Sequence, residues 1–367
     1  MSTSRRMRVA LLAAGFAIAL GPVSAQAADT IKIGVDEPLT GAVAASGNWV
    51  TQGAKMAADD INAKGGVLGR KLELVIEDNK SNPTEAVAAA EKLIVRDKVP
   101  VLMGAWSSTY TLAVMPKLME YKVPMVVETS SSDKITTSGN PYIFRTAATN
   151  GMEAKAFAKY VHKLGIKKAD FLVVNNDWGL GAAQAFSAML KSQGVKIGIE
   201  QTMDASTQDL SAQLSKIKAS DADTLFVTTG VEQITLILKQ AQSLGLKKRM
   251  IATGGDSSPA QLIQQVGDGA NGTYHILFFA PWFPQKAENP KVAEAFVNEW
   301  KKRGYDFAGL PDGFRGHDAI ATIAAAIKLA GKAEPEAIRK ALWEVHVKGI
   351  NGNISFVKEG PKGKESG

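Results

Sequence analysis

Short apolar runs rich in β-branched residues alternate with amphipathic stretches along most of the chain. These runs have the length and composition of buried strands. They cover residues 31–35, 72–76, 99–103 and 123–127, then 171–174, 195–199, 224–228, 250–253 and 274–279. Between the runs, apolar residues recur at helical spacing, so that Val50, Ala54 and Ile61 share one face of a predicted helix. Strands that alternate with helices in this way predict a parallel sheet covered by helices.

The alternating pattern forms two series of similar size, one before Arg145 and one after it. Two such series predict an α/β fold of two doubly wound parallel-sheet lobes. We expect short crossings between the lobes near 145–150, 274–281 and 353–357, which together are typical of a three-crossing hinge. The predicted division assigns 28–147 and 282–352 to the first lobe, and 148–281 and 353–367 to the second.

Residues 1–27 have the three-part pattern of a secretory signal peptide. Three arginines among the first eight residues precede an uncharged apolar stretch at 9–20, and Ala25-Gln26-Ala27 supplies the small residues of a cleavage site. The apolar stretch is shorter than the roughly 20 residues that cross a bilayer, which argues against a membrane anchor. We therefore expect cleavage after Ala27 and an exported mature protein.

Composition excludes several kinds of chemistry. The 367 residues include no cysteine, so disulfides, zinc–thiolate sites and thiol nucleophiles are absent. The four histidines lie far apart in the sequence, and we predict neither a metal site nor a cofactor. Gly179-x-Gly181 lacks the third glycine of a dinucleotide-binding motif, and no Walker A or Gly-x-Ser-x-Gly pattern occurs. The sequence therefore predicts a protein that is not an enzyme.

The charge balance gives no indication of a nucleic-acid partner. The formal net charge of +7 falls to +4 without the three arginines of the signal segment, which contains no acidic residue. Many of the remaining basic residues lie close to acidic ones, as at 167–170, which is typical of a solvated surface rather than of a phosphate-binding track. We expect no nucleic acid among the partners.

Hydroxyl-bearing and aromatic residues gather directly after predicted strands in both halves of the chain. The segments are 104–109, 128–132, 175–179, 229–232 and 254–258. In open α/β sheets, ligands bind beyond the carboxyl ends of the strands, where helix amino termini present N–H groups. Each segment alone could be only a helix cap. Together they predict a cleft between the lobes that suits a small anionic ligand with an apolar body.

Three segments carry a resemblance to a known family. They are Ile31-Lys32-Ile33-Gly34-Val35 followed by Pro38-Leu39-Thr40-Gly41, Asp60-Ile61-Asn62-Ala63-Lys64-Gly65-Gly66 with Gly69, and Asp177-Trp178-Gly179-x-Gly181. In order and spacing they resemble the leucine/isoleucine/valine-type (type I) periplasmic binding proteins of bacterial ABC importers, from about residue 31 to beyond 355. The resemblance implies a monomeric periplasmic protein that closes two lobes around a small ligand and delivers it to permease subunits in the membrane.

The resemblance also implies roles for individual residues. The family positions that hold the carboxylate of the ligand fall here on Ser108, Thr129 and Ser131. The stacking aromatic position falls on Trp178. The acidic partner of the ligand ammonium falls on Gly255 or Asp256, of which only Asp256 can fill that role. These residue types fit the roles, since hydroxyls at a helix amino terminus suit a carboxylate and a buried aspartate suits an ammonium.

Some positions depart from the family pattern. The aromatic residue of the second lobe falls on Gly230 or Val231, and an aromatic residue of the first loop is replaced by Ser46. Smaller walls leave room for a bulkier ligand. Trp106 and Ser107, in the loop that also holds the first carboxylate-binding serine, complete the predicted ligand contacts.

These residues predict a binding protein for a branched-chain or other hydrophobic amino acid. An alternative ligand is an aromatic or other small carboxylate without an amine, for which Asp256 would be dispensable. A different class is an exported hydrolase with Ser108 or Ser131 as nucleophile, but the sequence places no base near either. A third class is a sensory module that feeds a membrane receptor, against which the absence of a further long apolar segment argues.

Overall fold

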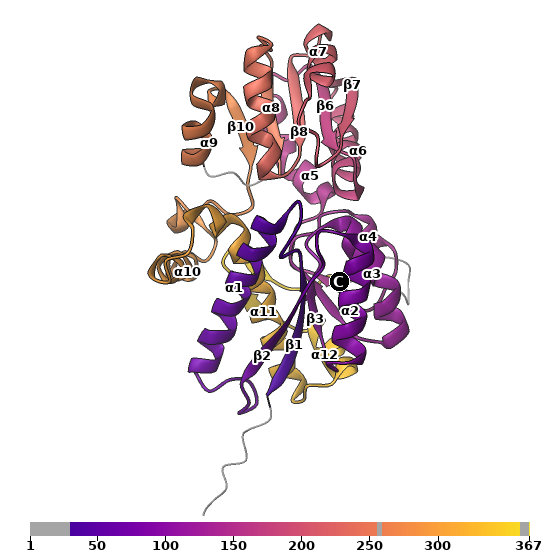
Figure 1. The fold of residues 1–367 in the computed structure, drawn as a ribbon, viewed down its shortest axis with the longest axis vertical. Helices are drawn as coiled ribbons and strands as arrows, with labels where there is room; N and C mark the ends of the chain where they lie inside the picture. The colour runs from indigo at the N-terminus through magenta and orange to yellow at the C-terminus, as the bar shows by residue number, and fades with distance from the viewer. Residues whose placement is uncertain (1–29, 255–258, 360–366) are drawn as a thin grey trace, which may run out of the picture.

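Two five-stranded parallel sheets form the framework of the computed structural model, which describes residues 30–254, 259–359 and 367 (Figure 1). The first sheet has the order β2-β1-β3-β4-β5 and contains β1 (Ile31–Glu37), β2 (Leu72–Asp78), β3 (Leu102–Gly104), β4 (Met125–Val127) and β5 (Ile143–Arg145). The second has the order β10-β9-β8-β6-β7 and contains β6 (Lys168–Val174), β7 (Lys196–Met203), β8 (Thr224–Thr228), β9 (Arg249–Thr253) and β10 (Thr273–Ile276). The predicted fold of two doubly wound lobes is confirmed.

Helices cover both faces of each sheet. The first lobe has α1 (Ala44–Ala63), α2 (Pro83–Val95), α3 (Ser108–Tyr121), α4 (Lys134–Thr137), α10 (Pro290–Lys302), α11 (Leu310–Ala330) and α12 (Pro335–Leu342). The second has α5 (Asn150–Val161), α6 (Asp177–Ser192), α7 (Ser211–Ala219), α8 (Val231–Ser243) and α9 (Pro259–Val266). In the part of the chain that the structure describes, no helix is both long and apolar enough to cross a membrane. The predicted signal segment, 1–27, lies outside that part.

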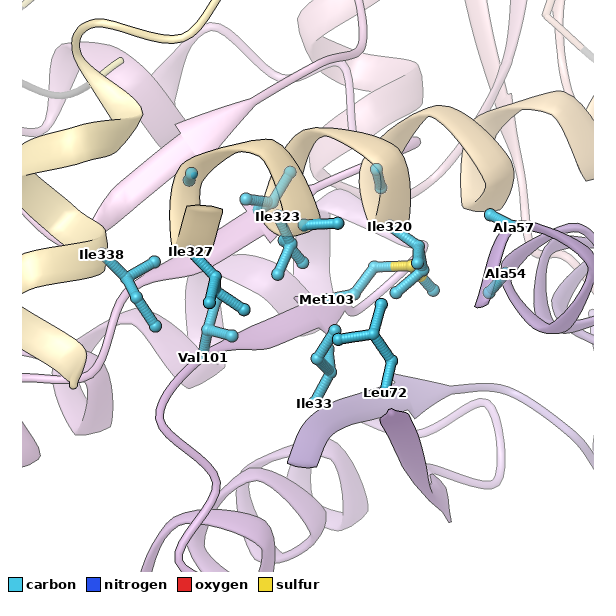
Figure 2. Packing of buried hydrophobic residues seen from close by; sticks show 14 of the residues in the cluster. Ile33, Ala54, Ala57, Leu72, Val101, Met103, Ile320, Ile323, Ile327 and Ile338 are labelled. Atoms are coloured by element: carbon cyan, nitrogen blue, oxygen red, sulfur yellow. The ribbon is translucent and has the colours of Figure 1, made fainter. Parts of the chain in front are cut away.

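Strand alternation divides the first-lobe core into two layers. Successive strand residues point to opposite faces of a sheet, so Met103 packs with α1, α11 and α12, whereas Leu102 packs with α2 and α3. Figure 2 shows Ile320, Ile323 and Ile327, which recur at helical spacing on α11, against the strand side chains of the first layer. The first sheet thus has α1 and α11 on one face and α2 and α3 on the other (Figure 1).

Aromatic contacts join the strands and helices of the second lobe. Phe171 and Phe226, on neighbouring strands, stack with ring centroids 5.4 Å apart. Phe157 of α5 meets Phe226 edge-on at 5.6 Å. Helix α5 was not among the predicted helices, although Thr149 caps it by accepting a hydrogen bond from the Met152 N–H at 3.0 Å.

The chain crosses between the lobes after β5 and again after β10, in agreement with two of the predicted crossings. The third predicted crossing, 353–357, lies beside them, because residues 351–354 line the same hollow as Thr146 and Phe278. However, β12 (Asn353–Ile354) pairs antiparallel with β11 (Val347–Lys348). The Phe356 ring lies 5.2 Å from Phe144 in the first-lobe core. The prediction assigned 353–367 to the second lobe, whereas the contact of Phe356 is with the first, and residues 360–366 lie outside the described part.

Candidate functional site

A cavity between the two lobes lies beyond the carboxyl ends of strands from both sheets. It holds about 610 Å³ of empty space, its opening to solvent included. The first lobe contributes Ser46, Trp106, Ser107, Ser108, Thr129, Ser130, Ser131, Asp312 and Arg315, the second contributes Glu153, Trp178, Gly230 and Gly254, and Phe278 comes from the second crossing. This edge of the sheets is where open α/β folds bind ligands.

Most of the predicted site residues come together at this cavity. Those that line it are Ser46, Trp106, Ser107, Ser108, Thr129, Ser131, Trp178 and Gly230. Val231 begins α8, and its side chain lies outside the described part of the structure, as does all of Asp256. Ser130 and Gly254 lie in the segments 128–132 and 254–258 that predicted the cleft, although neither was named as a ligand contact. The cavity residues outside any predicted segment are Glu153, Phe278, Asp312 and Arg315.

The loop after β3 presents a helix amino terminus at the cavity. Ser107 adopts extended dihedral angles at the N-cap of α3, and Ser108 begins the helix. The first N–H groups of a helix lack intrahelical acceptors and carry partial positive charge. The buried Ser108 hydroxyl accepts a hydrogen bond from the Ser132 N–H at 3.1 Å, so its own proton can be donated to a ligand. This arrangement favours a carboxylate.

A buried arginine fixes the loop that follows β4. Arg145 donates from Nη1 to the carbonyl oxygens of Ser130 at 3.2 Å and Ser132 at 2.7 Å. Burial lowers the pKa of Arg145 to about 10, so the side chain is still charged at neutral pH. In this loop the Ser131 hydroxyl donates to the Thr129 carbonyl at 3.2 Å. Thr129 Oγ1 is buried and has no hydrogen-bond partner among the described residues, and a ligand atom would satisfy it.

Three aromatic side chains, Trp106, Trp178 and Phe278, line the cavity. Trp178 packs against the backbone of Gly254, where a Cβ atom would lie 2.2 Å from its Cζ2 and φ is +74°. Glycine is therefore required at that position. Trp106 has a φ of +62°, which bulky residues rarely adopt, and its backbone N–H donates to Glu128 Oε1 at 3.1 Å. Backbone strain of this kind gathers at ligand sites.

Charged side chains also line the cavity. Glu153 on α5 and Arg315 on α11 are 5% and 6% exposed. Arg315 Nε lies 3.7 Å from Asp312 Oδ1, and the guanidinium carbon lies 4.7 Å from the centroid of the Phe278 ring. The one signal for these residues in the sequence is a charge that interrupts an otherwise apolar helical pattern, at 310–327 for Asp312 and Arg315.

Three acidic side chains are buried beside the first-lobe wall. Asp36 and Glu37 end β1, Glu128 follows β4, and each is at most 1% exposed. Burial raises the pKa of all three carboxyl groups, and the pKa of Glu37 is raised further by Glu128 and then by Asp36. The negative charge of Glu128 repels that of Glu37, so the arrangement favours the protonated form of Glu37. Among the residues that the structure describes, no cluster of histidine and acidic side chains could hold a metal ion.

Polar contacts connect the lobes beside the cavity. Thr109 of the first lobe donates from Oγ1 to Asp177 Oδ2 of the second at 3.1 Å, and Lys134 Nζ lies 3.3 Å from Asp177 Oδ1. Nearer the crossings, the Asn150 N–H donates to the Ser131 carbonyl at 2.8 Å. These bonds set the separation of the two walls of the cavity in this conformation.

Two doubly wound lobes around a ligand-sized cavity define a two-lobe solute-binding protein. The periplasmic binding protein family matches residues 30–364, and the chain belongs to that family. The relatives are solute-binding proteins and not enzymes. The chain is thus a substrate-binding protein of the kind that serves ABC transporters.

Similar proteins bind two kinds of ligand. A leucine-, isoleucine-, valine-, threonine- and alanine-binding protein of Pseudomonas aeruginosa is 29% identical over 96% of this chain and 92% of its own length. The structure of the branched-chain amino acid transporter substrate-binding protein LivJ of Streptococcus pneumoniae, in complex with isoleucine, has a TM-score of 0.79 and 28% identity over 90% of this chain and 92% of that one. An ABC transporter solute-binding protein of R. palustris in complex with 4-hydroxybenzoate has a TM-score of 0.77 and 27% identity over 89% of both chains.

Proposed function

We propose that the protein binds a small carboxylate, in first place an amino acid of about the size of leucine, and delivers it to the permease subunits of an ABC transporter. The proposal is carried by one observation: Ser108, at the amino terminus of α3, and Trp178 line the same cavity from opposite lobes. The carboxylate accepts hydrogen bonds from Ser108, Thr129 and Ser131 and interacts with the positive end of α3. Trp178 covers the apolar part of the ligand when the lobes close.

The ammonium group of the ligand is assigned to Glu153. This carboxylate is nearly buried and lines the cavity from the second lobe, opposite the serines of the first. An ammonium held against a buried carboxylate forms a strong, charge-assisted hydrogen bond. Asp256, which the sequence predicted for this role, lies outside the described residues, so experiment decides between the two acids.

A second candidate ligand is an aromatic carboxylate without an amine. Trp106, Trp178 and Phe278 supply apolar walls suited to a flat ring. The similar R. palustris protein was crystallised with 4-hydroxybenzoate. Such a ligand would use the same carboxylate-binding serines but would not need an acidic partner.

Isothermal titration calorimetry of the mature protein with L-amino acids and with benzoates tests the proposal. We expect Glu153→Gln to weaken binding of an amino acid by about tenfold or more and to leave binding of a benzoate unchanged. Asp256→Asn tests the other acid in the same way, and Glu200→Gln, on the exposed edge strand β7, is the control. If neither group of ligands binds the wild-type protein, the proposal is wrong.

Export and delivery are part of the same proposal. Removal of residues 1–27 would give a periplasmic, monomeric protein that begins at Ala28, which mass spectrometry and light scattering of the periplasmic fraction can establish. Cells that lack the protein should lose uptake of the solute that calorimetry identifies. Undiminished uptake would contradict the role in delivery.

A further inference from the structure

The cavity extends from one face of the first sheet to the other. Ser108 begins α3, which packs on the same face as α2. Ser46 near the start of α1, with Asp312 and Arg315 near the start of α11, belongs to helices on the opposite face. All four residues line the cavity. A ligand held by its carboxylate at Ser108 can therefore reach Ser46, Asp312 and Arg315 with its other end.

Close helix packing holds the two charged residues at this end. A Cβ atom on Gly313 would lie 2.2 Å from the Trp300 ring, and one on Gly316 would lie 2.0 Å from the Val50 carbonyl oxygen. Substitution at either glycine would displace α11. The start of this helix, which carries Arg315, is thus fixed by its neighbours before any ligand binds.

The Arg315 guanidinium group contacts two aromatic rings and an acidic side chain. Its guanidinium carbon lies 4.7 Å from the ring centroid of Phe278 and 5.3 Å from that of Phe314. Asp312 Oδ1 lies 3.7 Å from its Nε. With the side chain 6% exposed, this pair forms a wall that offers guanidinium donors and carboxylate acceptors side by side.

We infer that the ligand carries, at the end away from its carboxylate, an uncharged hydrogen-bonding group such as a hydroxyl or carboxamide, which Arg315 and Asp312 recognise together. The inference rests on the proposed function, since it takes the carboxylate to lie at Ser108. An uncharged group that both donates and accepts complements the pair. The pair carries no net charge, so a distal carboxylate attracted by Arg315 is repelled by Asp312, and a distal ammonium attracted by Asp312 is repelled by Arg315, whereas an uncharged group meets both favourably.

An aliphatic end is the weaker alternative. A branched-chain side chain in contact with Arg315 and Asp312 would make no hydrogen bond with either charged group, whereas a hydroxyl or carboxamide would. The sequence also favours a polar distal group, because Ser46 occupies a position at which the family resemblance implies an aromatic residue. The distal group of the ligand, rather than its size alone, would then distinguish this protein from a binder of branched-chain amino acids.

Matched ligand pairs test the inference by calorimetry. L-Asparagine and L-leucine have similar shapes and differ in the polarity of the side-chain end, and so do 4-hydroxybenzoate and 4-methylbenzoate. In the pair that binds, we expect the polar member to bind about tenfold more tightly or better. Equal binding, or tighter binding of the apolar member, overturns this inference and leaves the proposed function standing. If no member of either pair binds, this inference is wrong, and the wider titration with L-amino acids and benzoates decides the proposed function separately.

Two variants assign the preference to the charged pair. Arg315→Met keeps an unbranched apolar side chain and removes the donors, and Asp312→Asn removes the charge with little change of shape. Either variant, once its Tm shows that it is folded, should bind the polar ligand at most about threefold more tightly than its apolar counterpart. Arg339→Met, which breaks an ion pair with Glu336 outside the cavity, is the control and should keep the full preference. A full preference in both folded cavity variants overturns the assignment.

Discussion

Replacing Ser108 by alanine removes a hydroxyl that has two roles. Its Oγ accepts a hydrogen bond from the Ser132 N–H at 3.1 Å inside the first lobe. Its proton is available to the carboxylate of the ligand, because Ser108 begins α3 at the cavity wall. The variant should therefore lose both stability and affinity, each through a separate hydrogen bond.

The two losses follow from the kind of group that is left unpaired. A hydrogen bond to a charged acceptor contributes about 1.5–3 kcal/mol, so ligand affinity should fall roughly 10- to 150-fold. Ser132 is 1% exposed, and its N–H would lose its acceptor. Leaving such a donor unsatisfied costs about 1–3 kcal/mol in the free energy of unfolding.

Calorimetric titration and urea denaturation measure the two effects independently. Ser138→Ala is the matched control, because the Ser138 hydroxyl donates to the Ile135 carbonyl in the same lobe and does not line the cavity. The control should keep full affinity. If Ser108→Ala loses stability but binds its ligand within about threefold of the wild type, the hydroxyl is only structural and the assigned carboxylate position is wrong.

Further substitutions test other parts of the structure. Lys248 Nζ lies 3.1 Å from the fully buried carboxylate of Asp170, and Lys248→Met would leave that charge without its cation. The free energy of unfolding, measured by urea denaturation, should fall by about 3–5 kcal/mol, and a loss below about 1 kcal/mol would contradict this. Burial, and after it the charge of Glu128, raises the pKa of Glu37 in the folded state above its ordinary value of 4.5. The stability that protonated Glu37 contributes is therefore complete below about pH 4.5 and is lost as the pH rises through the folded-state pKa. Glu37→Gln should therefore raise Tm relative to the wild type more at pH 7 than at pH 4, and an equal difference at both would refute the burial argument. Gly254→Ala should displace the Trp178 ring and weaken ligand binding by about tenfold, with loss of the ligand-induced change in tryptophan fluorescence.

The part of the site that could be predicted from the sequence is the part made by local signals. Ser107 and Ser108 directly follow a strand and begin a helix, and both features are visible in a single short segment. The strand order then brings the ends of β3 and β4 together, so Thr129 and Ser131 join them at one cavity. The two-lobe fold could be predicted for the same reason, since strand and helix periodicities are local.

The rest depends on packing between distant segments. Arg315 lies more than 200 residues after Ser108 and reaches the cavity only because α11 packs against α1. Glu153 belongs to α5, a helix that was not predicted, and it lines the cavity together with residues from far along the chain. Likewise Phe356 makes a ring contact with Phe144 of the first lobe, which no sequence pattern specifies.

The contact between Trp178 and Gly254 lies entirely within the second lobe, whereas the hydroxyl groups that face it belong to the first. The indole ring therefore moves with the second lobe and needs no rotation of its own to expose the site. The dissociation rate of a bound ligand should therefore be set by the rate at which the two lobes open. A partner that bound both lobes and stabilised their separation would release the ligand without contacting it.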